Sequence, residues 1–566
     1  MPPGLNAMTA QPTSNEVSIG VMKFLLQLVE LSVTIEKIYF DGGLPTSKCD
    51  TRLERLETSR RKLEVFNNLS NQGLKSYGPR RTSLNITTHM VFNKQEPRIK
   101  LASLPENPFM IQSVIEDLKT RWNRDTIAEF VPSACDILPS SDYYIWKNTT
   151  EVVPGEADIY CADAAKQSGA AVLTGDSDLL VYDLGPHGSV IFFSSIESNE
   201  ANAEHEPVRI RATELCPNEI AKRLGVRSIQ RLAFELKRDP HLTLGKIVQR
   251  AKENTGGVEN NASYVAFSSE YASLDEPTLL DKSLQILDPR VSELYLQYVH
   301  PKFNSGNQPP VIYLPILIEN HSRQCAWYEG SEIRAVAFSI LNLTVPPENR
   351  RDRVLEYARR GIRIFPTAVS LIAEDSLQAR VSNVYNRLKS VLDSFGDASL
   401  LAWKSFAIQQ IFSGRDEETW PSPGHITKFL TSGCCAEVMD WEDIHLTAQI
   451  QSIFYSLRIL RQTLEVSISC IEPSLKDGVA LLLQLLRGLP PMRDLSHSLS
   501  DALMSEPASK VLIKNAVAVI FSIRGHNTRA RWPTCSTDSD ETHSKVQLPG
   551  PFKKTNNIYD ILGNID

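Results

Sequence analysis

The sequence has 566 residues, 42% of them hydrophobic and 22% charged, which is the composition of an ordinary globular protein. A chain of this length exceeds one typical hydrophobic core, so two domains are expected. The net charge of −7 excludes a protein coated in positive charge, and any nucleic-acid contact must therefore use a local basic surface. Nine scattered cysteines without zinc spacing, no signal-like N-terminus and short apolar runs predict a soluble intracellular protein without a membrane span.

The first part of the chain predicts alternating helices and strands. Residues 1–15 are expected to be disordered, and apolar residues at helical spacing predict a helix over 16–33. The β-branched and aromatic segment 34–40 predicts a strand that ends at Asp41. Further along the chain we expect a helix over 50–67, a loop or insertion over 70–106, and another helix over 109–122.

The next segment predicts a helix between two glycines, followed by strands. A helix with one apolar face follows Pro154-Gly155, and Gly169 stands where its C-terminal cap belongs. Short apolar runs over 170–174 and 190–193 predict two strands. Strands that alternate with helices indicate an α/β domain over 16–260, with a mostly parallel sheet flanked by helices.

The second half of the sequence shows a different pattern. Long helical stretches, for example 331–343, 379–392 and 448–464, predict a separate and mostly α-helical domain over 265–532. The polar tail 533–566 carries no periodicity and is predicted to be disordered.

Carboxylates gather in the α/β half, at predicted strand ends and at a helix start. A single aspartate after a strand is usually a helix cap or a turn former. Several such acids together repel one another unless a divalent cation lies between them, and their oxygens suit Mg²⁺ or Mn²⁺. Their placement favours a metal site over isolated caps. The acids are Asp41, Glu156, Asp158, Asp176 and Asp178.

These motifs resemble those of a known nuclease superfamily. The runs VPGEADIYCADAA and AAVLTGDSDLLVY resemble the internal motif of the flap-endonuclease (XPG-like) superfamily. Residues 38–45 (IYFDGGLP) are similar to its strand-to-D-G-x-x-P element, and the wider pattern FDGGLPxxKxxTR resembles the Asteroid-domain branch. Residues 325–341 also resemble that branch. The resemblance covers residues 16–255 with clear motifs and implies a PIN-like fold.

The resemblance also implies roles for these residues. Asp41, Glu156 and Asp158 would serve one metal ion, and the remaining acid pair, Asp176 and Asp178, a second. Two family basic residues that approach the scissile phosphate match Lys48 and Arg55.

Asp239 matches the position of a further family aspartate, which would make it another metal ligand. Lys237-Arg238 replace the usual Gly-containing pair before it. The alternative is that Asp239-Pro240 is a helix-terminating turn.

A basic stripe accompanies the acids. Nine Lys or Arg stand against four Asp or Glu over 46–84. Lys48, Arg52, Arg55 and Lys62 fall on one face of the predicted helix. We expect this face to contact nucleic acid, although a merely solvated helix could carry the same charges.

The sequence departs from the family pattern in two places. No aspartate precedes Asp41, so either the polypeptide is an N-terminally incomplete gene product or its first metal site is weakened. After Asp239 the family's Gly-rich helix-turn-helix is replaced by PHLTLGKIVQRAKEN, which predicts a plain helix.

Two functions follow as hypotheses. One is a structure-directed nuclease of the nucleus, with a role in DNA repair, that hydrolyses branched or single-stranded DNA with two Mg²⁺ or Mn²⁺ ions. The other is a catalytically impaired scaffold that binds DNA, RNA or a protein, with protein partners held by the helical domain.

Overall fold

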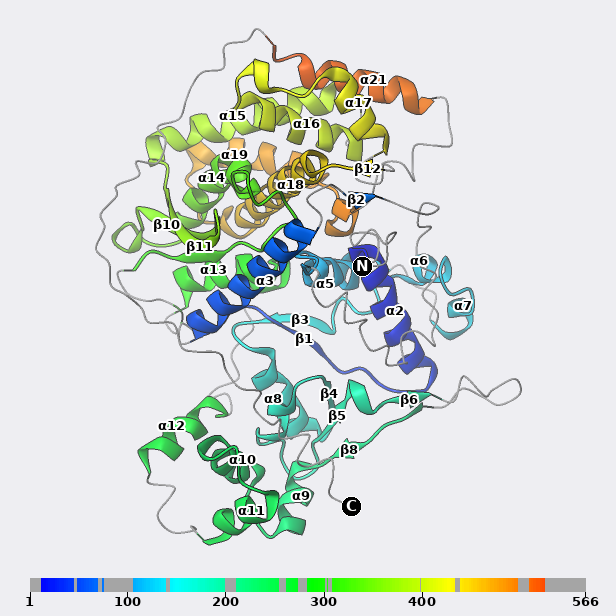
Figure 1. Ribbon diagram of the computed structural model, residues 1–566, viewed down its shortest axis with the longest axis vertical. Helices are drawn as coiled ribbons and strands as arrows, with labels where there is room; N and C mark the ends of the chain where they lie inside the picture. The colour runs from blue at the N-terminus through cyan, green and yellow to red at the C-terminus, as the bar shows by residue number, and fades with distance from the viewer. Residues whose placement is uncertain are drawn as a thin grey trace.

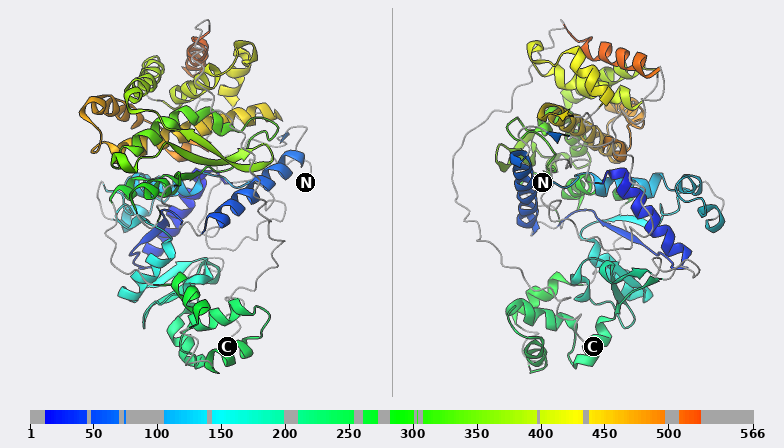
Figure 2. Two further views of the ribbon diagram at one scale, coloured as in Figure 1. Left: turned by 90° about the vertical axis from the view of Figure 1, so that its left-hand side faces the viewer. Right: turned by 45° about the vertical axis from the view of Figure 1, so that its right-hand side comes forward.

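The structure is a computed structural model that describes most of the chain. Its elements form three tiers (Figures 1 and 2): the helical half at one end, the first helices and strands in the middle, and α8 to α12 at the other end. No helix within these ranges is long and apolar enough to cross a membrane. The described residues are 12–44, 48–69, 74–75, 105–138, 143–198, 210–253, 261–272, 282–300, 303, 308–396, 399–432, 438–496 and 508–524.

Several sequence predictions lie mainly outside the described residues. The predicted disorder of 533–566 falls wholly outside them, and so does that of 1–15 apart from residues 12–15. Within the predicted loop over 70–106 only 74–75 and 105–106 are described.

The first helix, α2 (Ser14–Glu30), begins two residues earlier than predicted. The Thr13 hydroxyl accepts a hydrogen bond from the Glu16 N–H, and the Glu16 carboxylate accepts one from the Thr13 N–H, which makes a capping box. The buried face of α2 packs against α5 (Met110–Thr120), where the Ser18 hydroxyl donates to Asp117 at 2.6 Å. This packing places a helical layer beside the first strands (Figure 1).

Two parallel strands form the first small sheet. β1 (Ile38–Asp41) pairs in parallel with β3 (Thr150–Val153), and α3 (Cys49–Leu69) is the first helix that follows β1 in the chain. The predicted strand therefore exists and ends at Asp41 as expected, and the helix predicted over 50–67 extends by a residue or two at each end. Two short helices, α6 (Arg124–Ala128) and α7 (Ala134–Ile137), precede β3.

A second small sheet follows α8 (Ala157–Ser168). β4 (Ala171–Thr174) and β5 (Ser189–Phe192) are parallel, and β8 (Glu214–Leu215) pairs antiparallel with β5. The predicted glycine cap is confirmed, because Gly169 ends α8 in the left-handed conformation with a φ of 73°. A hairpin of β6 (Glu197–Ser198) and β7 (Ile210–Arg211) extends beside it.

The single parallel sheet predicted from the alternation is not formed. Among the described residues β1 pairs with β3 alone and β4 with β5 alone, so the strands lie in two separate sheets. Helix α8 packs against β1, β3 and β4 and so joins the two sheets by side-chain contacts. The fold is α/β as predicted, but its sheets are small and of mixed direction.

Helices complete the lower tier around their own apolar core. The plain helix predicted after Asp239 is α11. It packs against α10, to which residues 239–243 connect it. Aromatic side chains of α10 and α12 meet in this core, where the rings of Phe234 and Phe267 lie 5.6 Å apart. The helices are α9 (Pro217–Leu224), α10 (Ile229–Arg238), α11 (Leu244–Glu253) and α12 (Ala262–Glu270).

The second half is mainly helical, as predicted, but it also contains a sheet. β10 (Arg353–Arg360) and β11 (Arg363–Ser370) form an antiparallel hairpin, and β9 (Val311–Tyr313) pairs in parallel with β10. The minor pair β2 (Leu74–Lys75) and β12 (Val438–Met439) joins distant parts of the chain. The helices are α13 (Pro289–Val299), α14 (Ser331–Asn342), α15 (Glu374–Asp393), α16 (Leu400–Ser413), α17 (Pro423–Ser432), α18 (Trp441–Ser467), α19 (Pro473–Leu486) and α21 (Ala508–Phe521).

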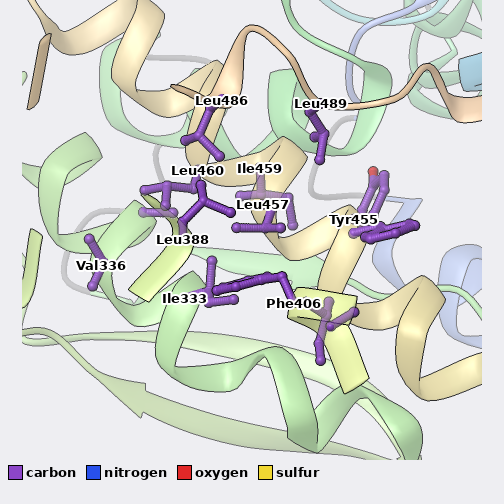
Figure 3. Close-up of a cluster of buried hydrophobic side chains, with 14 of the residues drawn as sticks. Ile333, Val336, Leu388, Phe406, Tyr455, Leu457, Ile459, Leu460, Leu486 and Leu489 are labelled. Carbon is purple, nitrogen blue, oxygen red and sulfur yellow. The ribbon is translucent and has the colours of Figure 1, made fainter. Parts of the chain in front are cut away.

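The largest core surrounds α18. Leu457, Ile459 and Leu460 of this helix meet Ile333 of α14 and Leu486 of α19 in a continuous apolar cluster (Figure 3). All five side chains are at most 3% exposed. Helix α18 is buried on most of its surface, so it is the central helix around which the others of this half pack.

Charged side chains link elements within the helical half, and they also link this half to α5 of the middle tier. Arg334 and Glu356 form a buried ion pair, and Arg334 also donates to the Ser456 hydroxyl of α18 at 2.8 Å. Glu116 of α5 accepts from the buried Arg458 of α18 at 2.9 Å. These contacts fix the position of α18 relative to α14 and α5, because sliding the helices apart would leave a buried charge unpaired.

Candidate metal centre

The strand β1 delivers Asp41 to the start of helix α8. Its carboxylate accepts a hydrogen bond of 2.7 Å from the backbone N–H of Ala157, the first residue of α8. The next residue must be glycine, since a Cβ on Gly42 would lie 2.1 Å from the carbonyl oxygen of Val153. In the Asp-Gly sequence, Asp41 thus places its carboxylate at the start of α8, and Gly42 allows β1 to approach β3 closely.

Two acids come from the first turn of α8. Glu156 is the N-cap residue and forms an ion pair with Lys48, which immediately precedes α3. Asp158 lies two residues after Glu156, still in the first turn of α8, where the positive end of the helix dipole favours a carboxylate. The order of caps and acids in the sequence thus brings both side chains to one end of α8.

The second acid pair follows β4 in a tight turn. Asp176 caps the short helix η2 (Ser177–Leu180), and its carboxylate accepts a 3.0 Å hydrogen bond from the Asp178 N–H. The Asp176 N–H in turn donates to the Thr174 hydroxyl at 2.9 Å. This turn holds the pair at the carboxyl end of β4, where ligands bind in open α/β sheets.

Electrostatics show that the five acids form one group. The pKa of Asp158 is raised from 3.8 to about 6, first by burial and then by the carboxylates of Asp176, Asp41, Glu156 and Asp178. Because each like charge favours the protonated form, all four must lie within electrostatic range of Asp158. The fold therefore brings the four carboxylates near enough to Asp158 to act on its charge, while their role as metal ligands stays a prediction.

Cations partly offset this repulsion. The pKa of Asp178 is raised by burial and by Asp176, whereas Lys48 and Lys237 lower it. Lys237 was not predicted as part of the site; it also pairs with Glu270 at 3.1 Å. No pattern near Lys237 indicated this role, because the approach of α10 to η2 is a tertiary feature.

The predicted basic stripe is divided between several partners. Arg55 lies exposed on α3, two turns beyond Lys48. Arg52 instead pairs with Glu293 of α13 at 2.9 Å, and Lys62 pairs with Glu106 at 2.8 Å. Part of the stripe thus holds α3 against its neighbours.

Asp239 lies at the C-terminal cap of α10 and not among the charges named above. Its carboxylate faces Arg250 of α11 at 3.6 Å, and its carbonyl accepts from the Leu242 N–H. This position is that of the helix-terminating turn, the alternative that the sequence left open. A metal-binding role for Asp239 stays a prediction.

The carboxylates do not form a closed set of metal ligands. Within the described ranges no three His, Cys, Asp or Glu side chains converge closely enough to hold one. The chemistry of the group still fits a hard divalent cation, because five carboxylates share one electrostatic environment and their repulsion is only partly neutralised by lysine.

Two tyrosines, the buried Tyr182 and the half-buried Tyr271, border the acids and were missed by sequence reasoning. Burial is the largest cause that raises the pKa values of Tyr182 and Tyr271, and carboxylates of the acidic group, Asp178 included, raise them further. Their rings meet edge to face, with centroids 5.2 Å apart. They form an apolar wall between the acids and the α9–α12 helices.

Parallel strands that end in grouped carboxylates, with a lysine beside them, define the class of protein as nuclease-like. Residues 106–371 match the family model described as XPG domain containing. That range includes Glu156, Asp158, Asp176, Asp178 and Asp239, and it crosses into the helical half.

The curated protein Asteroid homolog 1 of Schizosaccharomyces pombe is 27% identical to the chain over 267 residues. The alignment covers 46% of the chain and 48% of that relative, so the chain spans about half the length of the relative it matches. Both comparisons show that this part of the chain is similar to Asteroid/XPG-like nuclease-family proteins. No solved structure matches it.

Proposed function

We propose that this protein is a metal-dependent, structure-directed nuclease that hydrolyses phosphodiester bonds in branched or single-stranded DNA. One observation carries the proposal: burial and four neighbouring carboxylates raise the pKa of Asp158 to about 6. Such a concentration of like charge destabilises a fold and is typical of functional sites. The match to the XPG family model supports the same conclusion.

The chain's own residues divide the work. The carboxylates of Asp41, Glu156 and Asp158, together with the Asp176–Asp178 pair, would hold one or two Mg²⁺ or Mn²⁺ ions. Bound ions of this kind supply Lewis-acid activation of water and neutralise charge on the phosphate. Asp239 would join them only by leaving Arg250.

Basic residues of α3 would orient the strand. Lys48 lies beside Glu156 and lowers the pKa of Asp178, so a phosphate that approaches the acids also meets its ammonium group. Arg55 is exposed two turns further along the same helix, where a second phosphate of an extended strand can bind. Both residues would act by positioning and by charge.

The second candidate is a catalytically impaired nuclease fold that binds DNA, RNA or a protein partner. It is favoured by the absence, in the described ranges, of three converged metal-ligating side chains and by the pairing of Asp239 with Arg250. In this case the helical half would hold protein partners. A nuclear location and a role in DNA repair belong to the first candidate.

A cleavage assay separates the two candidates. Flap and splayed-arm DNA are incubated with Mn²⁺ and either the wild type, Asp176→Ala/Asp178→Ala, or the matched control Asp163→Ala/Glu219→Ala. The control removes two acids that pair with Gln167 and Lys222 outside the group. We expect cleavage by the wild type and the control, and at least a hundredfold slower cleavage by the first variant.

Other results would redirect the conclusion. Equal cleavage by all three proteins indicates a contaminating nuclease and removes support for the enzyme. Absence of cleavage by the wild type, with intact binding of the same DNA, favours the scaffold.

A further inference from the structure

A large cavity lies behind the wall formed by Tyr182 and Tyr271. It has a volume of about 840 Å³, is open to solvent, and is lined by the turn 180–186 and by helices α9, α10 and α12. Pockets of roughly 300–1,000 Å³ are the usual size for small organic ligands. None of the carboxylates assigned to the metal centre lines this cavity.

The cavity nevertheless adjoins the metal centre. Helix η2 carries Asp178 at its second residue and the cavity-lining Leu180 at its fourth. Tyr182 and Tyr271 line the cavity, and the charge of Asp178 acts on both. The cavity and the acidic group therefore share helix η2, and the two lining tyrosines lie within electrostatic range of Asp178.

The lining combines an apolar floor with basic and hydroxyl groups. Leu180, Ala221 and Ile229 are each at most 3% exposed and provide the floor. Lys166 and Arg227 line the cavity, and Lys166 forms an ion pair of 2.7 Å with Asp183, whose side chain is 65% exposed. This composition favours a ligand with a flat apolar body and a negative group.

Aromatic side chains give the cavity its flat surfaces. Tyr264 of α12 lines it, and the Arg231 guanidinium lies 5.5 Å from the Tyr264 ring centroid. Arg231 is 6% exposed, and its Nε and Nη1 have no hydrogen-bond partner among the described residues. Arg231 does not itself line the cavity and pairs with Glu235 at 2.5 Å, so its role is to support the Tyr264 ring.

We propose that this cavity takes one unpaired nucleobase, with its phosphate at Lys166, from a strand that passes the acidic group. The inference rests on the proposed function, because it needs a DNA strand at the acids. A base presents a flat ring to the tyrosines, and its phosphate can replace the exposed carboxylate of Asp183 at Lys166. The cavity would thereby select single-stranded or unpaired sites, since a paired base cannot enter it.

The test measures base-dependent binding without cleavage. A fluorescent single-stranded oligothymidine and an all-abasic strand of equal length and charge are titrated in EDTA, with anisotropy as the readout. Ser269→Trp and Val265→Trp each place a large ring at an exposed lining position of α12. Ala266→Trp is the matched control, at an exposed position of the same helix that does not line the cavity.

We expect the wild type and Ala266→Trp to bind the base-bearing strand about tenfold more tightly than the abasic strand. Both cavity-filling variants should lose that preference and bind the two strands equally. A preference that survives in Ser269→Trp and Val265→Trp, or a wild type that binds both strands alike, overturns the inference and leaves the proposed nuclease standing. A wild type that binds neither strand overturns the DNA-binding proposal itself.

Discussion

Replacement of Asp158 by asparagine should make the metal-free protein more stable at neutral pH. Burial, and then Asp176 and Asp41, raise the pKa of this carboxyl to about 6 from 3.8, so its ionised form is unfavourable in the fold. The amide of asparagine has a similar shape and carries no charge. A stabilising loss of a carboxylate is expected at a binding site and not at a structural ion pair.

The size of the effect follows from the pKa. A shift of about two units corresponds to an upper limit of about 3 kcal/mol. The side chain is only half-buried, so solvent screening reduces this value, and we expect about 1 kcal/mol. A change of that size raises the Tm by about 2–4 °C for a cooperative unit of this scale.

The pH dependence has a definite sign. Because the folded-state pKa of Asp158 lies above the unfolded value, the folded protein binds this proton more tightly. The carboxylate therefore causes no destabilisation below about pH 4, and the full destabilisation develops as the pH rises past about 6. The stabilisation by Asp158→Asn should be large at pH 7.5 and absent at pH 4.

Thermal unfolding in EDTA between pH 4 and 8 measures this difference. Asp163→Asn on the same helix is the control, since Asp163 is half-exposed and bonds only to Gln167. Mn²⁺ at about 100 times its Kd should add about 2.7 kcal/mol to the wild type and less to Asp158→Asn. A Tm for Asp158→Asn that equals or falls below the wild-type value at pH 7.5 without metal would refute the reasoning.

Three further predictions concern the site and its scaffold. Lys48→Met should weaken single-strand binding by about tenfold in anisotropy titrations while changing the Tm little, because its exposed pair with Glu156 contributes less than about 1 kcal/mol; a large Tm loss would contradict this role. Gly42→Ala should destabilise by about 1–3 kcal/mol in urea unfolding, because its Cβ meets the Val153 carbonyl, whereas Gly245→Ala, with open space around it, should not. Arg334→Met should cost about 3–5 kcal/mol by the same measurement, since Glu356 is left buried without its cation; an unchanged midpoint would show that the pair carries no stability.

Local signals in the sequence predicted the elements that carry the site. Gly169 ends α8, and the strand that carries Asp41 ends where the pattern indicated, whereas the Thr13–Glu16 capping box was not recognised and the start of α2 was placed two residues late. Such features depend on residues within one or two turns of each other, which the sequence displays directly. The acids at strand ends were therefore found without knowledge of the fold.

Contacts between distant residues were decided only by the tertiary structure. Strand pairing depends on hydrogen bonds to other segments, so the division of the strands into two sheets could not be derived from their alternation with helices. The same holds for Lys237, which reaches Asp178 from α10, and for Arg52, which turns to Glu293.

The sequence by itself determined which acids are available and at which strand or helix end each one lies. Only the tertiary structure decided which of them act on one another, and it placed Asp239 beside Arg250 instead. The physical reason is that charge interactions depend on distance in space, whereas spacing along the chain specifies only local geometry.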